Sequence, residues 1–163
     1  MPADPREQLL AELKAQEDQL WFDAFDNETA WELGVRLVEA ARQRNHALTI
    51  DVRRGSQQLF HAALPGTSTD NDLWVERKSL AAARFDCSSY RLAVEAEAGG
   101  YAFSSKFGAD PARYAAAGGS FPVRVRRVGL VGTVTVSGLP DAEDHAFIID
   151  VLRDFLQRSA ATR

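Results

Sequence analysis

Cysteine is almost absent from this chain of 163 residues, since Cys87 is the only one. A single cysteine cannot form a disulfide within the chain, and it excludes a zinc site built from several cysteines of one chain. This usage is typical of a reducing compartment. No histidine lies near Cys87 in the sequence, so we expect a buried thiol rather than a nucleophile.

Long apolar runs are also lacking. The first 20 residues, MPADPREQLLAELKAQEDQL, contain no apolar segment long enough for a signal peptide or a membrane span. The hydrophobic fraction of 45% and the mean hydropathy of −0.25 are ordinary for a soluble globular protein. We therefore expect a single domain in the cytoplasm, with no membrane partner.

An excess of positive charge is missing too, because 23 acidic residues outnumber 19 basic ones and leave a net charge of −4. This balance argues against a nucleic-acid partner. A local basic cluster, Arg124, Arg126 and Arg127, alternates along an expected strand. We interpret it as the solvated face of that strand.

Recognisable metal and phosphate motifs are absent as well. His46, His61 and His145 do not have the spacing of HxxxH, HxH or HExxH metal sites. The segments GGSFP and GLVGTVTVSG do not have the spacing of a dinucleotide-binding or P-loop motif. Each histidine is therefore expected to be structural. His145 has the best case for a functional role, because it lies close to a Ser-Gly-Leu-Pro turn.

Hydrophobic periodicity predicts the secondary structure. Apolar residues spaced about 3.6 positions apart predict five helices, over 5–20, 27–44, 72–85, 87–98 and 140–157. We expect Asp26 or Asn27 to cap the second helix and Asp70 or Asn71 the third, and Ser88 or Ser89 to start the fourth. Alternation predicts strands over 47–53, 58–64, 121–127 and 129–137. Residues 101–117 are ambiguous, although DPARYAAA could form a short helix with Pro111 in its first turn. This order predicts an α+β domain with a mainly antiparallel sheet.

Turn residues and polar residues gather at both ends of the last strand pair. Gly118 and Gly119 precede it, and Ser137-Gly138-Leu139-Pro140 follows it. Because the open ends of an antiparallel hairpin meet, we expect these turns to lie together with Asp144 and His145 of the last helix. We also expect the helix that carries Trp74, Arg77 and Lys78 to border this region. A purely structural alternative stays open, in which the glycines permit tight turns and Asp141 caps the helix.

Three ordered segments resemble a known family: ALPGTSTDNDLWVERKSLAAARFDCSSY, YAAAGGSFPVRV and GLVGTVTVSGLPDAEDHAFI. They are similar to uncharacterised protein family 0303, a branch of the haem-degrading-domain (GlcG-like) superfamily, and the similarity spans about residues 27–156. It implies a profilin-like α/β/α sandwich with about five antiparallel strands, the fifth within 101–106. It also implies an N-terminal helix and connector (1–25), one GlcG-like domain (26–158) and a homo-oligomer. Eight residues are similar to those that distinguish this branch from the wider superfamily: Asp70, Asn71, Trp74, Arg77, Lys78, Phe121, Asp144 and His145.

Three functions remain open from the sequence. The first is the binding of a small anionic ligand, for which Arg77 and Lys78 supply cationic donors, Trp74 an apolar wall and the glycines close backbone approach. The second, a haem- or iron-binding or haem-degrading enzyme with a histidine ligand such as His145, rests on the superfamily alone. The residues themselves assign no cofactor, and we expect the purified protein not to hold stoichiometric haem. The third is a structural or protein-interaction role.

Overall fold

Alternating apolar residues form the four predicted strands of one antiparallel sheet. In the computed structural model, which describes residues 3–162, these strands are β1 (Thr49–Arg54), β2 (Gln57–Ala63), β3 (Ser120–Val125) and β4 (Gly129–Ser137). Their order is β2-β1-β4-β3, and every neighbouring pair is antiparallel. The last residue of β4, Ser137, lies opposite Thr49 of β1. The α+β fold class is therefore confirmed.

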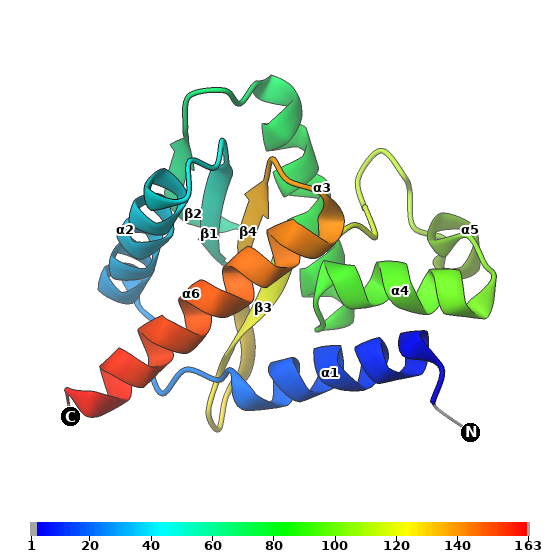
Figure 1. Cartoon of the computed structure of the whole chain (residues 1–163), viewed down its shortest axis with the longest axis horizontal. Coiled ribbons are helices and arrows are strands. Elements are labelled where there is room, and N and C mark those ends of the chain that lie inside the picture. The colour runs from blue at the N-terminus through cyan, green and yellow to red at the C-terminus, as the bar shows by residue number, and fades with distance from the viewer. Residues whose placement is uncertain (1–2, 163) are drawn as a thin grey trace.

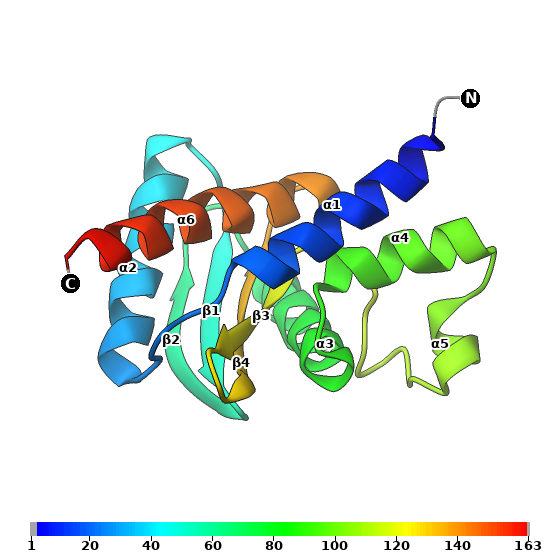
Figure 2. The same ribbon diagram turned by 90° about the horizontal axis from the view of Figure 1, so that it is seen from below.

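Helices flank this sheet on both sides (Figures 1 and 2). The described residues form α1 (Pro5–Gln19), α2 (Asn27–Gln43), α3 (Thr69–Phe85), α4 (Ser89–Gly99), α5 (Phe103–Phe107) and α6 (Asp141–Ala161). Asp26 caps α2 by accepting from Thr29 N, as expected. Among the helices of residues 3–162, none has the length and apolar character that a bilayer crossing requires.

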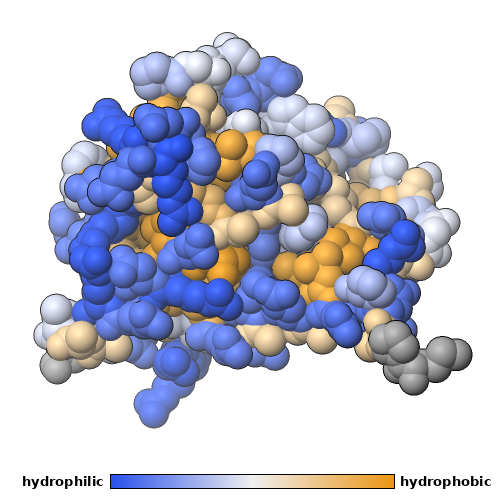
Figure 3. All heavy atoms as spheres, in the orientation of Figure 1, coloured by the Kyte–Doolittle hydropathy of each residue, from blue (hydrophilic) through white to orange (hydrophobic). Residues whose placement is uncertain are grey.

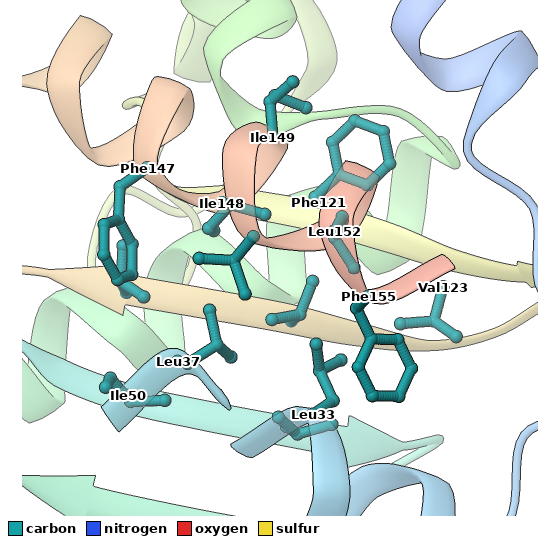
Figure 4. Packing of buried hydrophobic residues seen from close by; sticks show 14 of the residues in the cluster. Leu33, Leu37, Ile50, Phe121, Val123, Phe147, Ile148, Ile149, Leu152 and Phe155 are labelled. Atoms are coloured by element: carbon teal, nitrogen blue, oxygen red, sulfur yellow. The ribbon is translucent and has the colours of Figure 1, made fainter. Parts of the chain in front are cut away.

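The main hydrophobic core lies between the sheet and the pair α2 and α6 (Figure 4). It is built from alternate strand residues and from one stripe of each helix, and its members include Leu33, Leu37, Ile50, Val52, Phe121, Val123, Val134, Val136, Ile148 and Leu152. A smaller cluster, which contains Cys87, Leu92 and Phe103, joins α3, α4 and α5. On the face seen in Figure 3, hydrophilic residues predominate, and apolar residues surface along α6 and beside α4.

Several local expectations are wrong. Residues 103–107 form α5, so 101–106 supplies no fifth strand, and 111–113 form turns rather than a helix. The N-cap of α3 is Ser68 instead of Asp70 or Asn71, because the Asn71 side chain accepts from Ser68 N. Pro140 occupies the N-cap position of α6, so Asp141 is not its cap.

The basic cluster is not a uniform solvated face. Arg124 is largely covered, because its Nε donates to Asp86 Oδ1 at 2.8 Å and its Nη1 to the Glu17 carbonyl at 3.1 Å. Arg126 and Arg127 are exposed in the turn after β3. Burial raises the pKa of the Cys87 thiol to about 12, so this buried cysteine stays protonated, in agreement with the structural interpretation.

Candidate functional site

The open end of the last hairpin forms a polar pocket. β3 enters after Gly118 and Gly119, β4 leaves at Ser137, and the first turn of α6 and one side of α3 lie beside them. Together they enclose about 240 Å³, which we call the hairpin pocket. Its lining residues are Asp70, Asn71, Trp74, Lys78, Ala117, Ser137, Gly138, Leu139, Asp141 and Asp144.

Lys78 is buried at the base of this pocket. Its ammonium group donates to the Val136 carbonyl at 2.6 Å, to the Gly118 carbonyl at 3.0 Å and to Asp144 Oδ2 at 3.3 Å. Burial lowers the pKa of Lys78, and the neighbouring Asp144 carboxylate opposes that shift. Three acceptors match the three N–H groups of an ammonium, so Lys78 holds α3, the entry to β3 and the end of β4 together.

Asp144 completes this arrangement from α6. Its Oδ2 faces Lys78, and its Oδ1 accepts from Leu139 N at 2.9 Å, in the turn that leads into the helix. Burial raises the pKa of Asp144 to about 6, while Lys78 and the backbone N–H groups act in the opposite direction. The carboxylate therefore fixes the Ser-Gly-Leu-Pro turn to the first turn of α6.

Gly118 and Gly119 are required because other backbone and side-chain atoms lie very close to their Cα atoms. Gly119 has φ +128°, and a Cβ there would collide with Lys78 Nζ and with the Val136 carbonyl. A Cβ on Gly118 would collide with the Asp141 carbonyl. Only glycine leaves room for the Lys78 ammonium between these segments.

The rim of the pocket is acidic and aromatic. The carboxylates of Asp70 and Asp141 are exposed and form no ion pair within residues 3–162. Asn71 Nδ2 donates to Ser137 Oγ at 3.3 Å, and the side of Trp74 forms part of the wall. Ionised rim carboxylates favour ligands that bring positive charge or hydrogen-bond donors.

Arg77 does not enter the pocket. Its Nε donates to the Pro111 carbonyl at 2.9 Å, and its guanidinium lies 4.6 Å from the Trp74 ring centroid in a cation–π contact. Since Lys78 is also fully engaged, neither cation from which we predicted an anionic ligand is free in the pocket. That prediction loses its geometric basis within one chain.

His145 lies outside the lining residues, in the interior beneath α1. Its Nε2 is 2.7 Å from Gln16 Oε1, and its ring centroid is 5.2 Å from that of Tyr90 and 6.2 Å from that of Phe121. The amide oxygen can only accept, so Nε2 carries the proton. The other nitrogen, Nδ1, is buried without a hydrogen-bond partner among the described residues. Burial lowers the pKa of His145 to about 4.

Most of the predicted site residues do come together. The lining includes Asp70, Asn71, Trp74, Lys78, Ser137, Gly138 and Asp144, and the Gly118 carbonyl binds Lys78 while Gly119 packs against it. Arg77, Phe121 and His145 lie elsewhere, Phe121 in the core. Leu139 belongs to the Ser-Gly-Leu-Pro turn that was expected here, whereas Ala117 and Asp141 were missed, although each adjoins a turn that the sequence had singled out. Gln16, the partner of His145, was also missed, because a buried glutamine on a helix has no sequence signal.

Comparisons with known proteins agree on one family. Residues 25–153 match the family model described as "Haem degrading protein HbpS-like". The chain is 47% identical to a UPF0303 protein of Streptomyces coelicolor, over 96% of this chain and 99% of that protein. It is 43% identical to a UPF0303 protein of Edwardsiella ictaluri, over 92% and 96% of the two chains.

Solved structures show the same fold. The crystal structure of Ybr137w protein has a TM-score of 0.86 at 28% identity, over 93% of this chain and 89% of that one. The crystal structure of HbpS has a TM-score of 0.65 at 20% identity, over 81% and 89% of the chains. The PduOC:Heme complex has a TM-score of 0.67 at 16% identity, over 80% and 94%.

Proposed function

Because this chain belongs to the HbpS-like haem-degrading family, we propose that it is a cytoplasmic homo-oligomer that binds a small polar ligand in the hairpin pocket. One observation carries this proposal: α3, the Gly118-Gly119 turn, the end of β4 and the start of α6 converge on one polar cavity. Lys78 at its base gives all three N–H groups to acceptors of its own chain, one of them Asp144, so we assign this pair to holding the pocket open rather than to catalysis.

The charge of the pocket supports a ligand with a positively charged group. Lys78 and Asp144 neutralise each other, whereas Asp70 and Asp141 leave two unpaired carboxylates at the rim of the pocket. Trp74 already accepts the guanidinium of Arg77 against its ring, which shows that this indole accommodates a cation. A small ammonium compound with an apolar body fits these walls better than the anion predicted from the sequence.

Haem, the group in the family description, does not fit the side chains of one chain. Neither the hairpin pocket nor the cavity of about 490 Å³ beside Trp21 and Phe155 is lined by histidine, cysteine, methionine or tyrosine. His145 is enclosed by Gln16 and Tyr90, and His61 Nε2 lies 2.7 Å from Asp72 Oδ1. The half-buried His46 packs its ring edge-on against Phe147, with centroids 6.0 Å apart, and lines neither cavity. We therefore propose no haem chemistry for this protein.

Matched pairs of opposite charge test the ligand class. Benzylamine and benzoate, and likewise phenethylamine and phenylacetate, differ mainly in the sign of the charged group. We expect the amines to shift the indole N–H signal of Trp74 in ¹H–¹⁵N NMR titrations, with Trp21 and Trp31 as internal controls. The double variant Asp70→Asn/Asp141→Asn is expected to weaken amine binding by about tenfold, the sum of two partly exposed charge contacts.

Glu143→Gln is the control variant, because Glu143 lies in the same first turn of α6 but does not line the pocket. It should leave amine binding close to that of the wild type. Shifts of Trp74 with the carboxylates alone would support the anionic ligand instead. Binding of neither series would contradict a small-ligand pocket at this place.

A further inference from the structure

A second cavity lies at the other end of the last hairpin, away from the hairpin pocket. It forms where the connector between α1 and α2 (residues 20–26) passes between the C-terminal half of α6 and the turn that joins β3 to β4 (Figures 1 and 2). It encloses about 490 Å³, against about 240 Å³ for the hairpin pocket. Small-molecule sites commonly enclose roughly 300–1,000 Å³. This space, which we call the connector cavity, is therefore large enough for a small organic ligand.

The connector cavity is built mostly from residues outside the part of the chain that matches the family model. Eleven of its 15 lining residues come from 19–24 and 155–160, whereas the match spans residues 25–153. The remaining four are Thr29, Glu32, Arg126 and Arg153. The family description therefore does not account for this cavity, and the class of its ligand has to follow from its own side chains.

The inner side of the cavity is aromatic and firmly held. Phe22 N donates to the Arg124 carbonyl at 2.8 Å, and Arg126 N donates to the Phe22 carbonyl at 2.9 Å, so the connector is paired with the end of β3. The buried rings of Phe22 and Phe155 lie 6.2 Å apart, centroid to centroid. Because these contacts form the cavity before a ligand arrives, the entropic cost of binding is reduced.

Nearer the solvent, apolar side chains of the cavity are left partly open. Trp21 and Leu156 both line it and are only half-buried. The Arg124 guanidinium lies 5.6 Å from the Trp21 ring centroid, and this cation–π contact helps to hold the indole in place. Burying the remaining apolar surface is favourable, so a ligand with an apolar body fits this part of the cavity.

Two charged side chains of opposite sign line the cavity without a partner. Glu32 of α2 and Arg153 of α6 are exposed, and within residues 3–162 neither side chain forms an ion pair or a hydrogen bond. The other charged residues of the lining, Asp23 and Arg126, pair with each other at 3.1 Å. A ligand with a single charge would be attracted by one of the two unpaired groups and repelled by the other. The lining therefore favours a ligand that carries both charges.

We infer that the connector cavity binds a free α-amino acid with a large apolar or aromatic side chain. The carboxylate of the ligand pairs with the Arg153 guanidinium, whose fork of N–H donors matches two carboxylate oxygens. Its ammonium group pairs with Glu32, and its side chain lies against Trp21 and Leu156. The inference is independent of the function proposed for the hairpin pocket, because the two cavities share no lining residue.

L-Phenylalanine and two of its fragments test this site in ¹H–¹⁵N NMR titrations that follow the indole N–H signal of Trp21. The fragment 3-phenylpropanoate lacks the ammonium group, and phenethylamine lacks the carboxylate. We expect L-phenylalanine to shift the Trp21 signal in a saturable way and to bind at least about tenfold more tightly than either fragment, which is the loss expected for one charge-assisted contact. The absence of a saturable shift with L-phenylalanine would overturn the inference, and so would equal binding of either fragment.

Two charge-removing variants and two controls complete the experiment. Glu32→Gln and Arg153→Gln should each weaken L-phenylalanine binding by about tenfold. Glu28→Gln and Arg158→Gln remove the same charges from the same helices at positions that do not line the cavity, so they should bind like the wild type. All four side chains are exposed, so the variants are expected to fold. Wild-type affinity in either Glu32→Gln or Arg153→Gln would overturn the inference. The Trp74 signal reports separately on the hairpin pocket.

Discussion

Different kinds of interaction stabilise the two faces of the sheet. Toward α2 and α6 the strands present Ile50, Val52, Phe121, Val134 and Val136, all buried in the main core. Toward α3 the same strands present buried polar residues, namely Thr49, Asp51, Ser120, Thr133, Thr135 and Ser137. One face is stabilised by buried apolar area, and the other by directional hydrogen bonds and ion pairs. The hairpin pocket lies on the polar side.

Asp51 shows how the polar side satisfies a charge. Its side chain is fully buried, accepts from Gln58 Nε2 at 2.5 Å and pairs with Arg53 Nε at 2.8 Å. Arg53 also pairs with Glu76 of α3 at 2.7 Å. Burial nevertheless raises the pKa of Asp51. Each polar group on this side depends on particular partners, so single changes are expected to act more specifically there than in the core.

The largest effect is expected from breaking the buried ion pair. Lys78→Met leaves the Asp144 side chain, which is only 3% exposed, without its cation and should lower the free energy of unfolding by about 3–5 kcal/mol. Urea denaturation at pH 7 measures this loss. The double variant Lys78→Met/Asp144→Asn should lose less than the sum of the two single variants. Additive losses would show that the two side chains do not act as a pair.

The apolar face should respond to truncation in another way. Leu152 is fully buried in the main core, so Leu152→Ala should cost about 3 kcal/mol through lost burial and a cavity. No charge is involved, so the loss should be the same at pH 5 and pH 8. Urea denaturation at both pH values checks this. A strongly pH-dependent loss would contradict the division of the sheet into an apolar and a polar face.

His145, buried between α6 and α1, should make the stability of the fold sensitive to acid. Its pKa is about 4 in the folded chain, against an ordinary 6.5, so between these values the unfolded chain binds the extra proton and stability falls as pH falls. From pH 7.5 to 5, this loss should reach about 2 kcal/mol. Asp144, with its pKa raised to about 6, acts in the opposite direction. Its contribution cancels when wild type is compared with His145→Gln.

The comparison of wild type and His145→Gln uses urea denaturation across this pH range. The difference in free energy of unfolding between the two proteins should change by about 2 kcal/mol, with the variant losing less on acidification. Parallel pH profiles would show that His145 titrates alike in the folded and unfolded chains.

The smallest change in stability is expected from substitutions of two threonines of the polar face. Thr135 Oγ1 lies 2.8 Å from Ser120 Oγ, so Thr135→Val should cost about 1 kcal/mol by removing that hydrogen bond. Thr49 Oγ1 is equally buried but has no hydrogen-bond partner within residues 3–162. Thr49→Val should therefore be neutral or stabilising. Thermal unfolding of both variants checks this contrast, and equal losses would contradict it.

Local patterns predicted the elements well where one rule dominated. Alternation in ALTIDVR and GLVGTVTVSG located the strands, and the Asp26 and Ser88 caps located two helix starts. The prediction failed where the preference was weak or shared. Local patterns left 101–117 ambiguous, and the fifth strand within 101–106 was expected from the family resemblance alone. Residues 103–107 contain two phenylalanines that suit a strand as well as a helix, and in the helix they pack against Phe85 and Tyr101.

The candidate site was predicted by location more than by chemistry. Hairpin geometry alone implies that Gly119 and Ser137 meet, and the structure brings α3 to the same place. The sequence did not indicate which groups pair with each charged side chain. Lys78 was expected to hold an anion, yet it binds two carbonyl groups and one carboxylate of its own chain. Backbone carbonyls have no sequence signature, so their role as acceptors becomes visible only after folding.

By itself, the sequence determined the fold class, the hairpin whose ends form the pocket and the glycines at its entrance, because these depend on periodicity and on backbone conformation. Only the tertiary structure decided that Lys78 and Asp144 neutralise each other, that Arg77 turns to Trp74, and that Gln16 covers His145. The reason is physical: the free energy of a charge depends on its burial and on partners from distant segments, and residue order does not specify either.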